Sequence, residues 1–196
     1  MINSKKDYIS YLEADRIALG KPKYTFQTAA KEYIKRDLIW RFQRMLRKSE
    51  YHKNVLSKKS IFYKIIYFII KIRFKNLSMK LGFTIPENVF GKGLAILHYG
   101  TIVVNRKTIV GDNCRLHACT NIGESGGVAG APKIGKNVYI GPGAKIYGAI
   151  EIADNCVIAA NAAVNKSIVD KGMLVGGIPA KIIGAFDVSK LIKHIT

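Results

Sequence analysis

Histidine is the side chain best suited to proton transfer near neutral pH, and this 196-residue chain has four of them: His52, His98, His117 and His194. Such a residue can act as a general base toward a hydroxyl group. A catalytic zinc site usually needs three protein ligands, and at most two of these histidines are expected to meet. No metal is therefore expected, and a metal-binding or purely structural protein is a minor alternative.

The three cysteines, Cys114, Cys119 and Cys156, are odd in number and form no C-x-x-C pair. This pattern favours reduced thiols in a cytosolic protein. Met1 is followed by polar residues with no apolar core behind them, so no signal peptide is expected. A cytoplasmic location follows as the expectation.

A six-residue period replaces helical spacing over residues 85–184. The blocks begin at Ile85, Gly91, Leu97, Val110, Leu116, Ile122, Ile134, Ile140, Ile146, Ile152 and Ile158. A fixed period repeated this often predicts stacked structural repeats, with three hexapeptides to each coil of a triangular prism. Glycine and asparagine supply the tight turns between short strands.

The repeats place two histidines near each other. His117 follows His98 by 19 residues, one coil is 18 residues, and one extra residue is assigned between Val103 and Val110. Both histidines are then expected at the second position of their hexapeptides, one coil apart. Adjacent strands are about 4.8 Å apart, so the two side chains are expected to touch or to share a water.

The chain from Ile96 to Gly184 resembles the serine acetyltransferase branch of the hexapeptide-repeat acyltransferases, and is similar to polysaccharide and sugar O-acetyltransferases. The resemblance is carried by Leu97–Val104, Asn121-Ile122-Gly123, Val138–Gly148 and the closing Gly177-Ile178-Pro179-Ala180-Lys181. It implies a mainly β fold, a left-handed parallel β-helix over residues 85–184. The left-handed winding comes from the resemblance, because ordinary parallel crossovers are right-handed.

The resemblance also implies the chemistry and the assembly. His98 falls on the family's general base, which takes a proton from the acceptor hydroxyl as the hydroxyl attacks the acetyl-CoA thioester. Acetyl-CoA is then a co-substrate, lying between two β-helices of a homotrimer. Gly123, Gly143 and Ala160 would line its pantetheine arm, and Lys181 would lie near its phosphates. Turn geometry alone is an equally good account of the small residues.

Three departures from serine acetyltransferase concern the acceptor. The family's two acidic residues near the base fall on Phe83 and Leu97, and its Arg-His pair, which grips the amino acid carboxylate, falls on Gly130 and Ala131. His98 therefore lacks its usual partner.

Other residues near the base are candidates to replace the missing partner. His117 is proposed to orient His98 or to contact the acceptor, with Tyr99 and Asn121 as further candidates. The alternative is that His117 is an ordinary surface residue.

Acetylation of a sugar hydroxyl, on a surface polysaccharide or its precursor, is the preferred function. Serine O-acetylation in cysteine biosynthesis is the alternative.

Residues 1–84 are expected to form a basic α-helical region, with helices after Ser4, over Phe26–Lys48 and over Ser60–Lys80. This region holds 20 Lys and Arg against 6 Asp and Glu. An acidic partner is indicated: a membrane face, a phosphorylated carrier or a nucleic acid, although no nucleic-acid recognition motif is present.

The apolar segment Ile61–Phe74 has too few consecutive apolar residues to span a membrane. Two interpretations stay open: packing against the β-helix or a sister subunit, and peripheral association at the inner membrane face. Residues 185–196 are expected to form a tail with a short helix.

Overall fold

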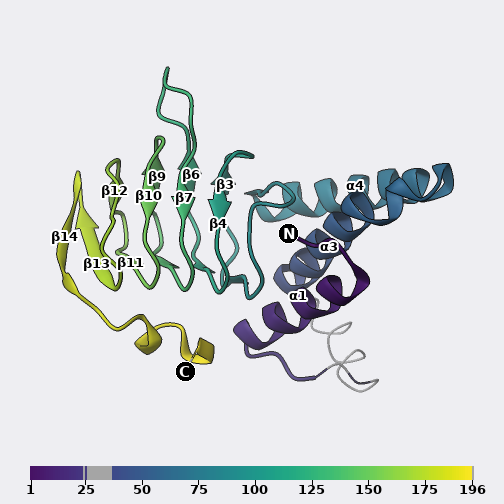
Figure 1. Cartoon of the computed structure of the whole chain (residues 1–196), viewed down its shortest axis with the longest axis horizontal. Helices are drawn as coiled ribbons and strands as arrows, with labels where there is room; N and C mark the ends of the chain where they lie inside the picture. The colour runs from purple at the N-terminus through teal and green to yellow at the C-terminus, as the bar shows by residue number, and fades with distance from the viewer. Residues whose placement is uncertain (24, 26–36, 196) are drawn as a thin grey trace.

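The computed structural model describes residues 1–23, 25 and 37–195. Three helices lie at one end of a stack of short strands (Figure 1). They are α1 (Lys5–Ala18), α3 (Leu38–Asn54) and α4 (Ile61–Leu81), with the 3-10 helix η1 (Leu56–Lys58) before α4. The helix predicted over 26–48 is found from Leu38 and ends later than predicted; its residues 26–36 lie outside the described residues.

The strands form three sheets, which are the three sides of a left-handed parallel β-helix, as predicted. Their orders are β1-β3-β6-β9-β12, β10-β7-β4 and β14-β13-β11-β8-β5-β2. The strands are β1 (Phe83–Thr84), β2 (Ala95–Ile96), β3 (Ile102–Val104), β4 (Ile109–Val110), β5 (Arg115–Leu116), β6 (Asn121–Gly123), β7 (Lys133–Ile134), β8 (Tyr139–Ile140), β9 (Lys145–Tyr147), β10 (Glu151–Ile152), β11 (Val157–Ile158), β12 (Ala163–Val164), β13 (Met173–Gly177) and β14 (Ala180–Ala185). Only β13 and β14 pair antiparallel among these strands.

One buried apolar residue per hexapeptide fills the prism, and none of these residues is more than 4% exposed. They are Phe90, Ile96, Val104, Val110, Leu116, Ile122, Ile134, Ile140, Ile146, Ile152, Ile158 and Val164. Their stacking along the axis explains the six-residue period, because each side chain packs on its equivalents in the coils above and below.

One corner of the prism is built from asparagines in the left-handed region. Asn113, Asn137 and Asn155 have φ values of 59°, 54° and 62°, which asparagine tolerates better than most residues. Their side-chain amides form a ladder, each donating to the next at 2.9 Å. The corner is therefore held by side-chain hydrogen bonds as well as by backbone geometry.

The register of the hexapeptide blocks predicted for the first coil is wrong by one residue. Ile96, rather than Leu97, points inward and pairs with Leu116, whereas Val104 pairs with Ile122. Two extra residues therefore lie between Ile96 and Val104, and none is inserted between Val104 and Val110, which are six apart. Ile96 and Leu97 are both aliphatic, so composition alone did not decide which begins the block.

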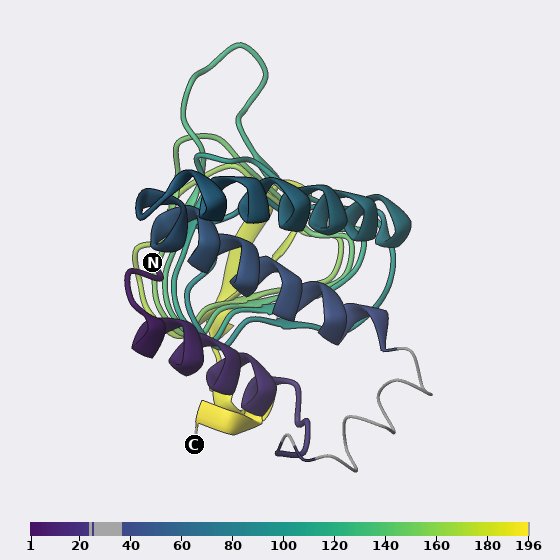
Figure 2. The same cartoon turned by 90° about the vertical axis from the view of Figure 1, so that its right-hand side faces the viewer.

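The helices form a layer across the N-terminal end of the β-helix (Figure 2). Ser4 and Ser60 cap α1 and α4 through their hydroxyl oxygens, which accept from Asp7 N and Tyr63 N. α4 ends at Gly82, whose φ of 74° suits a glycine C-cap. The Gly82 carbonyl accepts from Ile102 N at 3.1 Å, so the end of α4 fixes the segment that carries His98.

The C-terminal tail runs back along one side of the β-helix (Figure 1). It contains two 3-10 helices, η2 (Val188–Lys190) and η3 (Lys193–Ile195). Val188 and Ile192 are buried against Val157, with Tyr139 and Leu174 beside them. Within the described residues, no helix has the length and apolar character needed to cross a membrane.

Candidate active site

His98 lies in the two-residue insertion between β2 and β3, and its side chain is exposed. The insertion packs on the next coil at Gly100, whose φ is 125°. A Cβ on Gly100 would stand 3.3 Å from the Ala118 Cβ, which leaves little room for a larger residue. The imidazole is therefore presented to solvent on a bend that the neighbouring coil supports.

His117 lies beside His98, with the ring centroids 5.8 Å apart. The His117 ring also contacts the Tyr139 ring, at a centroid distance of 5.0 Å. The two histidines do not share a hexapeptide position: His117 directly follows the inward Leu116, while His98 is two residues after the inward Ile96. The insertion brings the rings together despite that difference in phase.

The ionisation of His117 is set by its surroundings. Burial lowers the pKa of His117 to about 4, and the positive charges of Arg115 and His98 act in the same direction. Its Nε2 atom is buried and has no hydrogen-bond partner among the described residues. Burial and Arg115 also lower the pKa of His194 in the tail. His117 is thus a neutral imidazole at physiological pH, next to an exposed one.

The other predicted site residues are distributed around this pair. Phe83 is 3% exposed and makes an edge contact with Phe42, so it belongs to the core beneath the helical layer. Tyr99 is 59% exposed next to His98. Asn121 begins β6 on a different sheet, beside Gly123, where its Oδ1 is 3.6 Å from the position of an added Cβ. Within the described part of the chain, no carboxylate is bonded to His98.

The four predicted cofactor residues lie on several coils. Gly143 has a φ of 76°, and a Cβ there would stand 2.0 Å from Asn161 Oδ1, so its turn alone requires glycine. A Cβ on Gly123 would meet only ordinary contacts. Ala160 and Lys181 are exposed. Gly123 and Gly143 are half-buried, so only two of the four residues are fully open to solvent in the single chain.

The strand register connects the histidines to Lys181. The backbone ladder aligns His117 with Gly141, Ala159 and Gly176 on successive strands, and Gly176 pairs with Lys181. Four strand spacings separate the ends of this line, about 19 Å. The three residues between them carry at most a methyl group, although Ile183 Cδ1 lies 2.9 Å from the position of a Cβ on Gly176. Gly141 and Gly176 are buried, and a Cβ on Gly141 would stand 2.8 Å from Ala160 N, so two of the three residues between the ends of the line are covered in the single chain.

The loop between β6 and β7, residues 124–132, projects from the prism (Figure 1 and Figure 2). It contains no lysine, arginine or histidine. Its one charged residue, Glu124, forms an ion pair with Lys107 at 2.9 Å. The loop therefore offers no positive side chain to a carboxylate on an acceptor.

Sequence reasoning missed the residues that surround the histidines from other parts of the chain. Tyr139 packs on His117, Arg115 affects both His117 and His194, and the tail covers the same sheet. Tyr139 occupies the hexapeptide position before an inward isoleucine, as Arg115 does before Leu116. Correct strand register would have placed Tyr139 near His117, but nothing local predicts that the tail folds back.

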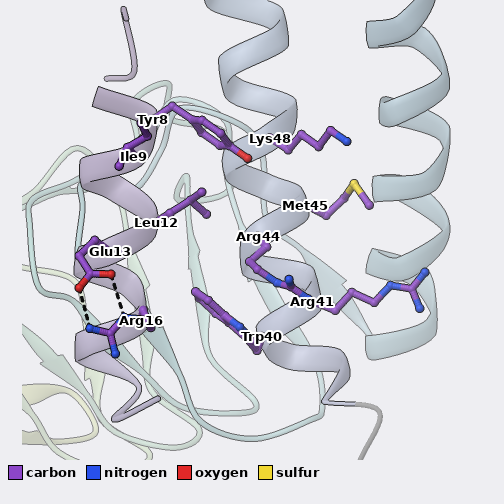
Figure 3. Close-up of a pocket in the computed structure, with 10 residues that line it drawn as sticks. All are labelled: Tyr8, Ile9, Leu12, Glu13, Arg16, Trp40, Arg41, Arg44, Met45 and Lys48. Atoms are coloured by element: carbon purple, nitrogen blue, oxygen red, sulfur yellow. Dashed lines mark hydrogen bonds and ion pairs between the residues drawn. The ribbon is translucent and has the colours of Figure 1, made fainter. Parts of the chain in front are cut away.

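A cavity of about 540 Å³ lies between α1 and α3, away from the β-helix (Figure 3). It is lined by Tyr8, Ile9, Leu12, Glu13, Arg16, Trp40, Arg41, Arg44, Met45 and Lys48. Neither His98 nor His117 lines it, so the cavity is separate from the two histidines. Among the described residues, no group of three His, Cys, Asp or Glu side chains is arranged to hold a metal ion.

Comparison with known proteins identifies the class of fold. The family described as bacterial transferase hexapeptide (six repeats) matches residues 131–166. A serine acetyltransferase of Mycobacterium tuberculosis is 36% identical over 101 residues, which is 50% of this chain and 44% of that protein. This chain thus spans less than half the length of that curated relative.

Solved structures agree with the fold. Serine acetyltransferase from Brucella abortus in complex with coenzyme A has a TM-score of 0.67 and 24% identity, over 93% of this chain and 70% of the other. Serine acetyltransferase from Neisseria gonorrhoeae in complex with serine has a TM-score of 0.69 and 23% identity, over 92% and 71%. The chain carries a hexapeptide-repeat β-helix like that of these proteins. Its sequence is similar to the serine acetyltransferase-like branch of the hexapeptide-repeat acyltransferases, so the predicted resemblance is confirmed.

Proposed function

We propose that this chain is an acetyl-CoA-dependent O-acetyltransferase with His98 as its general base. The observation that carries the proposal is the exposed imidazole of His98 beside neutral His117, on a β-helix of the serine acetyltransferase type. His98 takes the proton from the acceptor hydroxyl as that oxygen bonds to the acetyl carbon. The carbon–sulfur bond breaks, and the departing thiolate recovers the proton from His98.

Acetyl-CoA is proposed to lie along the line from His117 to Lys181. Lys181 at the far end of the line is exposed, and its ammonium group can pair with a phosphate. Gly123 and Ala160 present further accessible backbone, while Gly143 is accounted for by its turn. Coenzyme A in the complex of the Brucella relative supports this choice of co-substrate.

Serine is the acceptor that the comparisons support best. Curated relatives carry the name serine acetyltransferase, and one solved relative is in complex with serine. The comparisons thus favour the alternative acceptor over the sugar that the sequence analysis preferred. Serine O-acetylation, the acetylation step of cysteine biosynthesis, is the proposed reaction.

A sugar hydroxyl, on a surface polysaccharide or its precursor, is the second candidate. The specific observation is the loop of residues 124–132, which has no positive side chain and whose Glu124 is negative. An acceptor without a carboxylate does not need a charged partner there, whereas serine forgoes a charge-assisted bond of about 1.5–3 kcal/mol.

One assay separates the two acceptors. Purified protein with acetyl-CoA is supplied in turn with serine, with monosaccharides and with nucleotide-linked sugars, and release of the CoA thiol is measured. Saturation at sub-millimolar serine supports serine acetylation and excludes the sugar. Saturation only by a sugar reverses that choice, and no release above hydrolysis with any hydroxyl acceptor contradicts O-acetyl transfer.

A homotrimer in the cytoplasm completes the proposal. His98 is exposed on one face of the prism, so a neighbouring subunit is needed to close the site around an acyl donor. The three cysteines are free thiols, which suits a reducing compartment.

A further inference from the structure

α4 has two apolar faces, and only one of them is covered. Phe74, Leu77 and Leu81 are buried within the core that α3 and the first coil share, and Ile70 is buried as well. The opposite face is exposed, with fractions from 46% to 71%. It consists of Ile61, Phe62, Ile65, Phe68, Ile69, Ile72 and Met79. A surface helix usually presents polar residues to water, so this second face needs a partner.

Positive side chains border the exposed apolar face on both sides. At 100° per residue, the seven apolar residues fall within one arc of the helix. Lys64, Lys71 and Lys75 follow one edge of that arc, and Arg73 and Lys80 follow the other. The 21 residues of α4 include no aspartate or glutamate. The face is thus an apolar strip framed by cations.

Neighbouring charges leave this frame positive. Lys71 is the member that is partly neutralised, because it contacts Glu87 at 3.4 Å and Tyr67 at 3.0 Å. Glu87 is also bound by Lys53 at 3.1 Å. Lys58 and Lys59, just before α4, are exposed and add to the positive side.

We propose that the exposed face of α4 binds the surface of an anionic lipid bilayer. The helix, about 31 Å long, lies in the interface plane with its apolar strip in the headgroup boundary and its cations on lipid phosphates. An apolar face edged by Lys and Arg is typical of such in-plane helices. The position of α4 at the outer edge of the helical layer leaves that face accessible (Figure 2).

A second copy of the chain in a two-fold contact is the competing occupant, and its charges argue against it. A two-fold contact places the same surface on both sides, so each cationic edge would meet a cationic edge. No acidic residue of α4 is available to compensate. An anionic bilayer supplies the opposite charge along both edges at once.

Co-sedimentation of the full chain with vesicles tests the proposal. Vesicles of equal parts phosphatidylglycerol and phosphatidylcholine should bind the protein, and vesicles of phosphatidylcholine alone should bind it far more weakly. Added salt should weaken binding through screening. Replacing Lys64→Gln or Lys75→Gln should each weaken binding about fivefold, and Ile65→Gln should weaken it roughly tenfold.

Matched controls separate this face from the rest of the surface. Ile17→Gln removes an exposed isoleucine from α1, and Lys166→Gln removes an exposed lysine from the β-helix; both should bind vesicles like the unchanged protein. All five variants should keep the acetyl-transfer rate on a soluble acceptor, so a failed lipid proposal leaves the proposed function intact.

Two results overturn the proposal. The first is equal binding of anionic and neutral vesicles, or α4 variants that bind as tightly as the unchanged protein. The second is a lower oligomeric mass of Ile65→Gln in lipid-free solution, which would assign this face to a second copy of the chain.

Discussion

His98 and His117 form a pair of imidazoles, and His117 is the member whose protonation is disfavoured by burial. Hydrolases and transferases that use a histidine base often place a carboxylate behind it, which stabilises the imidazolium that forms. His117 is neutral at physiological pH because burial lowers its pKa to about 4. It can orient the ring of His98 or bind an acceptor hydroxyl, but it cannot supply a negative charge. The proposed base, His98, therefore has no anionic partner among the described residues.

Replacing His98→Ala should lower acetyl transfer by a factor of ~10²–10⁴, which is the usual contribution of a general base. Binding of CoA should barely change, because the proposed line for its arm lies on later coils. Steady-state rates and calorimetric CoA binding measure the two effects. His52→Ala in α3 is the matched histidine control and should leave the rate unchanged; a His98→Ala rate above half of the original would remove His98 from catalysis.

The free energy of unfolding should depend on pH through the protonation of His117. An unfolded histidine takes up a proton near pH 6.5, whereas His117 in the folded chain does so near 4. Between these values the unfolded state binds more protons, so its population rises as pH falls. The folded chain therefore loses stability on acidification through this window, and it keeps this contribution above about pH 6.5.

His117→Gln should remove that contribution, so its unfolding free energy should fall less steeply between about pH 6.5 and 4. Denaturant titrations of both proteins, referenced at about pH 8 where neither state is protonated, measure the difference. If the unfolding free energies of the two proteins change equally with pH, the pKa of His117 in the folded chain is not lowered. Transfer rates of the same variant test the orienting role, which an unchanged rate would exclude.

At the scale of elements, one buried arginine joins the helices to the first coil. Arg47 of α3 is fully buried and forms ion pairs with Asp15 of α1 at 2.8 Å and Glu50 at 3.0 Å. Its guanidinium also donates to the carbonyls of Phe90 at 3.0 Å and Gly91 at 2.6 Å. Asp15 in turn accepts from Leu94 N at 2.9 Å. The helical layer is thus attached to the β-helix through one hydrogen-bonded network.

Arg47→Ala should destabilise the chain by about 3–5 kcal/mol, because Asp15 and Glu50 would stay buried without their cation. Chemical denaturation measures the loss. Lys133→Ala removes a surface pair with Glu151 and is expected to cost about 0–1 kcal/mol. Equal losses for the two variants would mean that the buried network adds no more than a surface pair.

At the scale of the whole molecule, the prism presents three flat sides and an exposed site. A closed ring of three such prisms gives each subunit the same neighbour, and it places three equivalent sites at the subunit boundaries. The helical layer and the lipid-binding face of α4 then occupy one end of each prism. The exposed α4 faces of the three subunits can then point in the same direction, toward one bilayer surface.

Sedimentation velocity at micromolar concentration should give three times the 21.7 kDa mass of one chain. The reason is that His98 is exposed in a single subunit and needs a second wall. Dilution into monomers should abolish acetyl transfer together with the trimer. A fully active monomer would contradict both the assembly and the shared site.

The sequence by itself determined the β-helix and its neighbouring histidines, because few folds other than a β-helix need an aliphatic residue at every sixth position. Helix starts after Ser4 and Ser60 were also predicted, since capping is a local effect. The hexapeptide register at Ile96 was not predicted correctly, because Leu97 is equally aliphatic. Only the pairing of Ile96 with Leu116 distinguishes the two residues.

Tertiary structure alone decided the surroundings of the site. The low pKa of His117 depends on Arg115 and on burial beside Tyr139, and the burial of Arg47 depends on Asp15, which is 32 residues away. The tail reaches Val157 only by folding back along the prism. Desolvation and ion pairing are set by groups that meet through packing, and local sequence periodicity carries no information about which distant groups those are.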